Sequence, residues 1–274
     1  MGEDSHPFSK SMSPGLPIKA IAWDLGGVLF TERKSIAVVK LERDYHYDWE
    51  LVTSFLLSPQ SKDLPKGLIA DGEFWAWAQD KLPERYDAAT IRKVWYESYI
   101  LDNDVLALIK KLKGQYKLVA FSDNIKSRIE LLDQKYDFRR LFDQQVYSFD
   151  FHCIKPHKKF IGKMIQVSEC SPSEIVYVDD NADCAPPAEG LGVNFILYSR
   201  QDIRHLQREL NKLGVRLQRA ALVSTVETDC GTMGCFYSKA ETVEQWTNRG
   251  KLAVRMLQFA CCESSLPCPR KQLS

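Results

Sequence analysis

The chain has 274 residues, a length that suits one compact domain with room for an inserted module. Its composition is 45% hydrophobic and 27% charged, which is ordinary for a globular protein and excludes wholesale disorder or a fibrous repeat. The formal net charge of +1 gives no overall field toward nucleic acid. No apolar run approaches the roughly 18 residues that a bilayer-spanning helix needs. We therefore expect neither a nucleic-acid nor a membrane partner.

The two ends of the chain carry weak patterns. Residues 1–17 are polar and broken by prolines, which predicts a flexible leader without the apolar stretch of a secretory signal. We therefore expect a cytoplasmic protein. Its eight cysteines match no common zinc spacing and have no secretory context, so we favour reduced thiols over a metal or redox site. Residues 216–274 hold five of them and predict a partly disordered C-terminal extension without an assigned fold.

Residues 18–30 open with a short apolar run that ends at Asp24, followed by two glycines, a pattern typical of a buried strand ending in a tight turn. Residues 31–100 then contain no convincing strand. Apolar side chains at helical spacing predict helices over 35–45, 71–82 and 88–99, which we interpret as an inserted helical cap. Four aromatic residues are assigned to the core of this cap, with a substrate pocket as the alternative: Trp75, Trp77, Trp95 and Tyr99.

Residues 101–215 alternate between the two kinds of element. The predicted helices cover 104–113, 126–136, 158–167 and 201–213, and the predicted strands cover 116–121, 145–148, 175–178 and 193–198. Alternation of this kind predicts right-handed crossovers and a parallel sheet covered on both faces. The fold class is therefore α/β, with a Rossmann-like parallel-sheet core formed by residues 18–30 and 101–215.

Polar residues follow four of the predicted strands. Asp24 ends the first strand, Ser122-Asp123-Asn124 the second, Lys155 follows the third and Asp179-Asp180 ends the fourth. Each motif by itself is ordinary turn or helix-cap sequence. Ligands of open parallel sheets bind at the carboxyl ends of the strands, so the joint occurrence of these residues predicts a single site there.

The residue types indicate phosphate chemistry. Asp24 is a candidate nucleophile, because a carboxylate can accept a phosphoryl group and release it to water. Ser122 can donate a hydrogen bond to a phosphate oxygen, and Lys155 can supply positive charge that keeps Asp24 ionised. The N–H groups of Gly26 and Gly27 can approach the same anion.

Three of these acids predict a metal. Asp24, Asp179 and Asp180 placed side by side repel one another strongly unless a cation lies among them, and carboxylate oxygens are typical ligands of Mg²⁺. The backbone carbonyl of Gly26 is a further candidate ligand. We therefore expect Mg²⁺ as the cofactor.

The four motifs together resemble those of the haloacid dehalogenase superfamily: Asp24-Leu-Gly-Gly-Val-Leu, Ala-Phe-Ser122-Asp-Asn, Lys155-Pro and Val-Asp179-Asp180-Asn181-Ala-Asp183. The segment 31–100 lies where that superfamily places a helical cap of the first type. The pattern is most similar to the sugar-phosphate phosphatases of the glucose-1-phosphate type. The resemblance implies a Mg²⁺-dependent phosphatase acting on a small phosphorylated metabolite through an aspartyl-phosphate on Asp24. Asp123 and Asn124 join Gly26, Gly27, Ser122 and Lys155 as implied phosphate-binding residues, and we expect a monomer or homodimer.

Two residues depart from the superfamily pattern. Gly26 stands where most phosphatases of the superfamily carry an Asp that serves as general acid. Asp123 follows Ser122 where Asn or Thr is more usual, and we interpret it as the N-cap of the next helix, with contact to a sugar hydroxyl as the alternative. Two other functions stay open. One is a haloacid dehalogenase, which uses the same nucleophile without a metal, and the other is a catalytically silent regulatory protein that binds a partner.

Gly26 leads to a test of substrate type. General acid catalysis typically raises the reaction rate by about 10²–10⁴-fold. Without a general acid, the enzyme is expected to favour substrates with good leaving groups, such as an anomeric sugar phosphate or an acyl phosphate. Gly26→Asp should then raise the turnover of an alkyl phosphate more than that of an aryl phosphate, measured as phosphate release. Equal changes for both substrates would reject this explanation.

Overall fold

The computed structural model describes residues 16–31, 34–198 and 202–217. The predictions for the leader before residue 16 and for the extension after residue 217 lie outside these residues. A five-stranded parallel sheet forms the centre of the structure, in the order β5-β4-β1-β6-β7. Its strands are β1 (Ala20–Trp23), β4 (Lys117–Ser122), β5 (Gln144–Tyr147), β6 (Ile175–Asp179) and β7 (Asn194–Leu197). The predicted parallel α/β sheet is confirmed.

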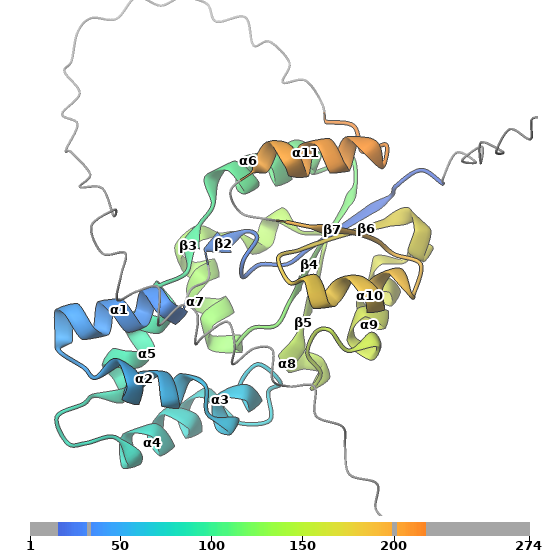
Figure 1. The fold of residues 1–274 in the computed structure, drawn as a ribbon. Helices are drawn as coiled ribbons and strands as arrows, with labels where there is room; N and C mark the ends of the chain where they lie inside the picture. Colours follow the sequence, from blue (N-terminus) through green and yellow to red (C-terminus); the bar gives the residue numbers. More distant parts are fainter. Residues whose placement is uncertain (1–15, 32–33, 199–201, 218–274) are drawn as a thin grey trace, which may run out of the picture. The chain divides into compact units, whose positions relative to one another are not determined.

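Helices cover both faces of this sheet (Figure 1). On one face lie α6 (Asn103–Leu112), α7 (Lys126–Tyr136) and α11 (Ile203–Lys212), which share a buried apolar cluster with Ile21 and Trp23 of β1. On the other face α9 (Lys158–Ser168) and α10 (Ala185–Glu189) pack against Ala20 and Ala22. Because β1 is buried on both faces, its sequence is continuously apolar rather than alternating.

The chain crosses from β1 to β4 and β5 on one side and to β6 and β7 on the other. The strand order therefore reverses beside β1, and the carboxyl ends of β1, β4 and β6 meet there. The connections between the strands of the sheet also contain α8 (Ser148–Phe151) and the short 3₁₀ turns Arg139–Leu141, Pro172–Glu174 and Ala182–Cys184. Such a reversal is the usual ligand site of an open α/β sheet.

The helical insert has its own apolar core. Its helices are α1 (Lys34–Tyr45), α2 (Trp49–Leu56), α3 (Pro59–Asp63), α4 (Asp71–Lys81) and α5 (Ala88–Glu97). Trp75 and Trp95 are buried in this core and Trp77 packs on it, as expected. The expectation for Tyr99 was wrong, because this residue belongs to the apolar cluster between the sheet and helices α6, α7 and α11. Helices α2 and α3 were not predicted, since eight and five residues are too few for a clear helical period.

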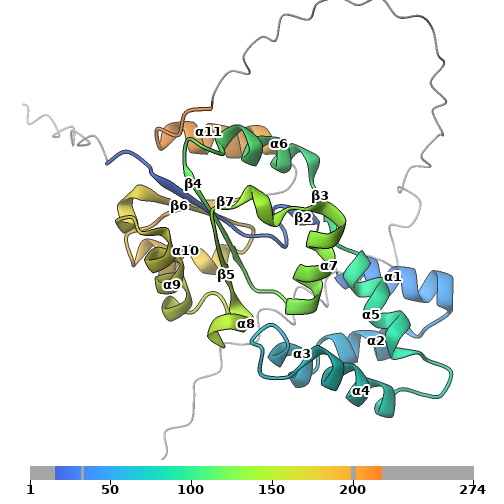
Figure 2. The ribbon, with the colours of Figure 1, turned by 180° about the vertical axis from the view of Figure 1, so that it is seen from behind.

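A short pair of strands joins the cap to the core, which corrects the expectation of an insert without strands. β2 (Phe30–Thr31) pairs antiparallel with β3 (Ile100–Leu101), and the Thr31 hydroxyl donates to the carbonyl of Ile100 at 3.1 Å. Two residues are too few for an alternating pattern. The pair ties the beginning of the insert to its end. On the other side of the junction, the view from behind shows α7 beside the cap helix α5 (Figure 2), where Ile125 packs in the cap cluster.

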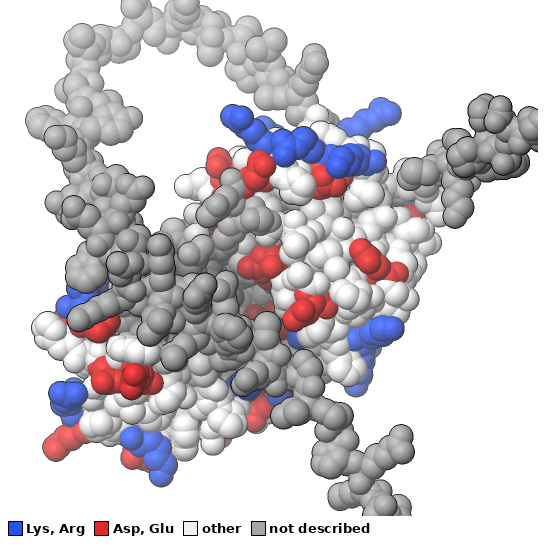
Figure 3. All heavy atoms as spheres, viewed as in Figure 1, with Lys and Arg blue, Asp and Glu red and all other residues white. Residues whose placement is uncertain are grey.

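The described surface carries both signs of charge. Figure 3 shows basic side chains gathered over α11, where Arg204, Arg208 and Lys212 are exposed. Arg208 pairs with Asp202 at 3.2 Å and Lys212 with Glu209 at 2.8 Å, so part of this charge is compensated locally.

Two further sequence predictions meet the structure here. Within the described part of the chain, no helix combines the length and apolar character needed to cross a bilayer. The three cysteines in this part, Cys153, Cys170 and Cys184, are free thiols. The other five lie outside it.

Capping side chains begin helices of the insert, and one of these caps can be tested directly. The carboxylate of Asp87 accepts the N–H groups of Ala89 and Thr90 at 3.2 and 3.0 Å and so caps α5. Asp87→Ala should lower the free energy of unfolding by about 1 kcal/mol, measured by urea denaturation. Asp80→Ala, at an exposed position of α4, is the matched control, and an equal loss in both variants would contradict the capping role.

Candidate active site

Strand register brings Asp24 next to Asp179. Trp23 of β1 pairs with Val178 of β6, and the N–H of Asp24 donates to the Val178 carbonyl at 2.9 Å. The two acids therefore follow paired positions at the carboxyl ends of adjacent parallel strands. Both side chains are buried, with exposed fractions of 5% for Asp24 and 0% for Asp179. The predicted convergence of these two acids is confirmed.

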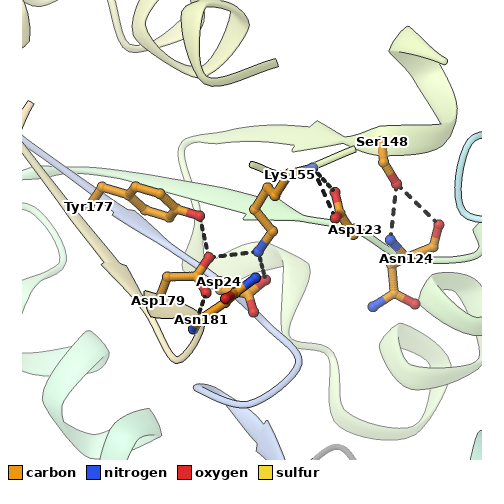
Figure 4. A network of polar contacts seen from close by, with 8 residues as sticks. All are labelled: Asp24, Asp123, Asn124, Ser148, Lys155, Tyr177, Asp179 and Asn181. Carbon is orange, nitrogen blue, oxygen red and sulfur yellow. Dashed lines mark hydrogen bonds and ion pairs between the residues drawn. The ribbon is translucent and has the colours of Figure 1, made fainter. Parts of the chain in front are cut away.

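Lys155 bridges the two acids (Figure 4). Its Nζ lies 2.8 Å from Oδ1 of Asp24 and 2.7 Å from Oδ2 of Asp179, and its side chain is 7% exposed. Burial lowers the pKa of Lys155, but the carboxylates of Asp179 and Asp24 outweigh this effect and raise it well above the usual value. Lys155 therefore stays charged and holds both acids in place.

Asp179 has further donors. The hydroxyl of Tyr177 donates a short hydrogen bond to Oδ2, and the N–H of Asn181 donates to Oδ1 at 2.8 Å. Burial raises the pKa of Tyr177 well above its usual value, so the phenol remains a donor. Tyr177 was not predicted as a site residue. Its position two residues before Asp179 on one strand puts both side chains on the same face of the sheet, which is the signal that could have found it.

Asp180 lies against the turn after β1. A Cβ added to Gly27 would be 2.0 Å from Oδ2 of Asp180, and Gly27 has φ +90°, a conformation that side chains disfavour. Glycine is therefore needed here for close approach. The N–H of Gly27 already donates to the Phe30 carbonyl at 2.9 Å, so we no longer assign this amide to phosphate. For Gly26, which lies in the same turn, the roles in phosphate and metal binding stay predictions.

The acids form a cluster that fits a divalent cation. Asp24, Asp179 and Asp180 each place a carboxylate oxygen within 4.8 Å of the others. Oxygens on opposite sides of a bound Mg²⁺ are about 4 Å apart, so small side-chain movements complete such a site. With Lys155, the four groups carry a formal charge of −2. Burial raises the pKa of Asp24 well above its usual range, Lys155 lowers it, and Asp179 raises it further. The net negative charge of these groups is the kind of charge that a divalent cation offsets.

Among the residues that the structure describes, two buried donors at the end of β4 find no hydrogen-bond partner. They are the Ser122 hydroxyl and the Nδ2 amide of Asn124, in side chains that are 1% and 2% exposed. Oδ1 of Asn124 accepts the N–H of Ile125 at 2.9 Å, which fixes the orientation of the Asn124 side-chain amide. Buried donors without acceptors are costly, and an anion beside them removes this cost.

Asp123 does not cap the following helix. Ile125 occupies the N-cap position of α7 and makes no side-chain cap. Instead, both carboxylate oxygens of Asp123 accept the backbone N–H of Lys155, at 3.2 and 3.0 Å. The expectation of an N-cap was wrong, because alternation along β4 directs Asp123 to the face where Lys155 lies. Asp123 thus positions Lys155.

Comparison with known proteins agrees with this architecture. The model of the haloacid dehalogenase-like hydrolases matches residues 18–192. An uncharacterised protein of Dictyostelium discoideum is 37% identical over 219 residues, which cover 69% of this chain and 94% of that protein. The match to the family model covers the residues that carry the four motifs.

Two solved structures show the same fold. A HAD family enzyme from Bacteroides thetaiotaomicron, in complex with magnesium and inorganic phosphate, superposes with a TM-score of 0.61 at 19% identity, covering 69% of this chain and 98% of that chain. L-2-haloacid dehalogenase from Xanthobacter autotrophicus gives a TM-score of 0.50 at 21% identity, covering 71% and 82%. Identities this low bear on the fold and leave the choice between the two reactions to the site.

The contact of Gly27 with Asp180 gives a test of the metal centre. In Gly27→Ala the added Cβ displaces the Asp180 carboxylate, so magnesium affinity should fall by about 10–100-fold, as measured by isothermal titration calorimetry. Gly192→Ala is the matched control, because Gly192 has φ +84° and its added Cβ makes only an ordinary 3.5 Å contact with Pro172. Unchanged magnesium affinity in Gly27→Ala would contradict the site.

Proposed function

Since the chain belongs to the haloacid dehalogenase-like hydrolases, we propose that it is a magnesium-dependent phosphatase that forms an aspartyl-phosphate on Asp24. The observation that carries this proposal is the cluster of Asp24, Asp179 and Asp180, in which Asp24 and Asp179 also contact the ammonium of Lys155. A hydrolase that only displaces halide from carbon needs no such set of acids. The related enzyme crystallised with magnesium and phosphate supports the same choice.

Asp24 and Lys155 have separate roles in the proposed reaction. Lys155 holds Oδ1 of Asp24 at 2.8 Å, which leaves Oδ2 to attack phosphorus. A new bond forms between Oδ2 and phosphorus while the bond from phosphorus to the leaving oxygen breaks, and water then cleaves the acyl phosphate to release inorganic phosphate and regenerate Asp24. When bound, Mg²⁺ supplies positive charge that offsets the charge of the acids and of the phosphate.

The phosphate oxygens find donors at the end of β4 and on Lys155. The Ser122 hydroxyl and the Asn124 amide, which have no partner within the described part of the chain, each offer one hydrogen bond, and Lys155 offers charge. Asp123, a carboxylate close to this anion, is kept in place by the Lys155 N–H. It acts through Lys155 rather than on the phosphate itself.

The substrate class follows from Gly26. Because this position is glycine, the turn after β1 offers no side-chain acid that could protonate the leaving oxygen. We therefore infer a small phosphorylated metabolite whose leaving group is stable as an anion, such as a sugar phosphate esterified at its anomeric carbon. A haloacid substrate is the second candidate, since a dehalogenase shares the fold.

The nucleophile is tested by Asp24→Asn, which preserves shape and removes the attacking carboxylate. Phosphate release from a panel of sugar phosphates should fall by about 10⁴-fold, and chelation of magnesium should abolish it in the unaltered protein. Asp104→Asn, at an exposed position on α6 and outside the acid cluster, is the control and should keep its activity.

The same assays separate the alternatives. Chloride release from 2-chloropropionate without magnesium, together with no phosphate release, would identify a dehalogenase. Absence of both activities, with a thermal shift on adding a protein partner, would identify a silent binding protein.

A further inference from the structure

One buried hydroxyl contacts both the cap and the segment that carries the phosphate donors. Ser148 is the first residue of α8 and is fully buried. Its Oγ accepts the N–H of Asn124 at 3.1 Å and donates a short hydrogen bond to the carbonyl of Pro65, in the cap loop between α3 and α4. Figure 4 shows its side chain directed at Asn124.

The hydroxyl has one proton and two acceptors within reach. Besides the Pro65 carbonyl, the carbonyl of Asn124 lies 3.5 Å from Oγ. The proton serves only one of them at a time. With the cap loop in place, the hydroxyl donates to the cap, and with the loop displaced, the acceptor that remains is Asn124. The bonding of Asn124 therefore changes with the position of the loop.

The cap loop is seated on α8 by two more contacts. The carbonyl of Lys66 accepts the Nδ1–H of His152 at 2.8 Å. Gly67 has φ +64°, and a Cβ added there would be 2.7 Å from the backbone oxygen of Phe149. The loop thus reaches α8 only because residue 67 is glycine.

The contact between cap and core at α7 is different in kind. The guanidinium of Arg128 on α7 is buried and lies 4.6, 5.0 and 4.5 Å from the ring centroids of Trp95, Tyr96 and Tyr99. A buried cation enclosed by rings has no alternative partner in solvent and forms a fixed tether. The loop on α8, held by a few hydrogen bonds, is the part of the junction that can release.

We propose that Ser148 is a positioning residue that couples seating of the cap loop 64–68 to the geometry of Ser122 and Asn124, so that the phosphate donors are aligned only while the cap is closed on the core. This inference rests on the proposed phosphatase function, because it requires phosphate at Ser122 and Asn124. Coupling between two sites is reciprocal, so phosphate bound at these donors must in turn hold the loop on α8.

The test is hydrogen–deuterium exchange of the full chain with magnesium, with and without inorganic phosphate. The amides of Gly67 and Leu68 donate to Leu64 and Asp63 and report on loop seating. In the unaltered protein, phosphate should slow their exchange by about fivefold, the effect of one ordinary hydrogen bond. In Ser148→Ala the slowing should disappear, while phosphate still protects the segment 122–126.

A second variant acts from the cap side and keeps the test valid if Ser148→Ala does not fold. Gly67→Ala pushes the loop from Phe149 without touching Asn124, and it should lose the same phosphate effect and raise KM for phosphate esters. Gly114→Ala is the matched control, because Gly114 has φ +80° with nothing within 4 Å of the added Cβ.

Three results would overturn the coupling. In the first, Ser148→Ala and Gly67→Ala both retain the slowing by phosphate. In the second, phosphate protects 122–126 of the unaltered protein but never the loop, which rejects the coupling and leaves the phosphatase function standing. In the third, phosphate protects neither segment of the unaltered protein, which rejects the phosphatase function and the coupling with it.

Discussion

The buried ammonium of Lys155 is the interaction on which the site depends. It lies within 2.8 Å of two carboxylates that follow paired positions on adjacent strands, Asp24 and Asp179. Without it, two acids would be buried side by side without a counter-charge, an arrangement that costs several kcal/mol. With it, they are fixed in one geometry, and the negative charge that remains suits a divalent cation.

The rest of the sheet edge serves to hold this ammonium. Asp123 accepts the backbone N–H of Lys155, and Tyr177 and the N–H of Asn181 orient Asp179. Asp123 follows β4, Tyr177 lies in β6, and Asn181 follows β6. Lys155 and Asp179 are therefore held in place by backbone and side-chain partners that the fold positions before any ligand binds.

The cap is joined to this edge in two ways that differ in strength. On one side, aromatic rings enclose Arg128. On the other side, the cap loop is held by the hydrogen bond from Ser148 to Pro65 and by the close approach of Gly67 to the backbone of Phe149. A hydrolase of this architecture must admit substrate and then exclude bulk water. A fixed junction at one side and a releasable one at the other meet both requirements.

Much of the fold could be predicted from local pattern. The sequence of Lys126–Tyr136 predicted the observed helix to the residue, and the apolar runs before Asp24, Ser122 and Asp179 predicted β1, β4 and β6. These elements are long or fully buried, so their signal is strong. The eight-residue α2 and the paired strands Phe30–Thr31 and Ile100–Leu101 are shorter than the window in which a period is visible.

The chain's order of strands and acids determined by itself that Asp24, Ser122, Lys155 and Asp179 meet at one edge, because parallel strands present their carboxyl ends together. Only the tertiary structure decided what each neighbour does. Asp123, which we expected to cap a helix, accepts the N–H of Lys155 instead. Ser148, which was not predicted as a site residue, contacts the inserted cap domain. Such roles depend on contacts between residues 24–83 positions apart in sequence, and no local periodicity encodes the distance or direction of those contacts.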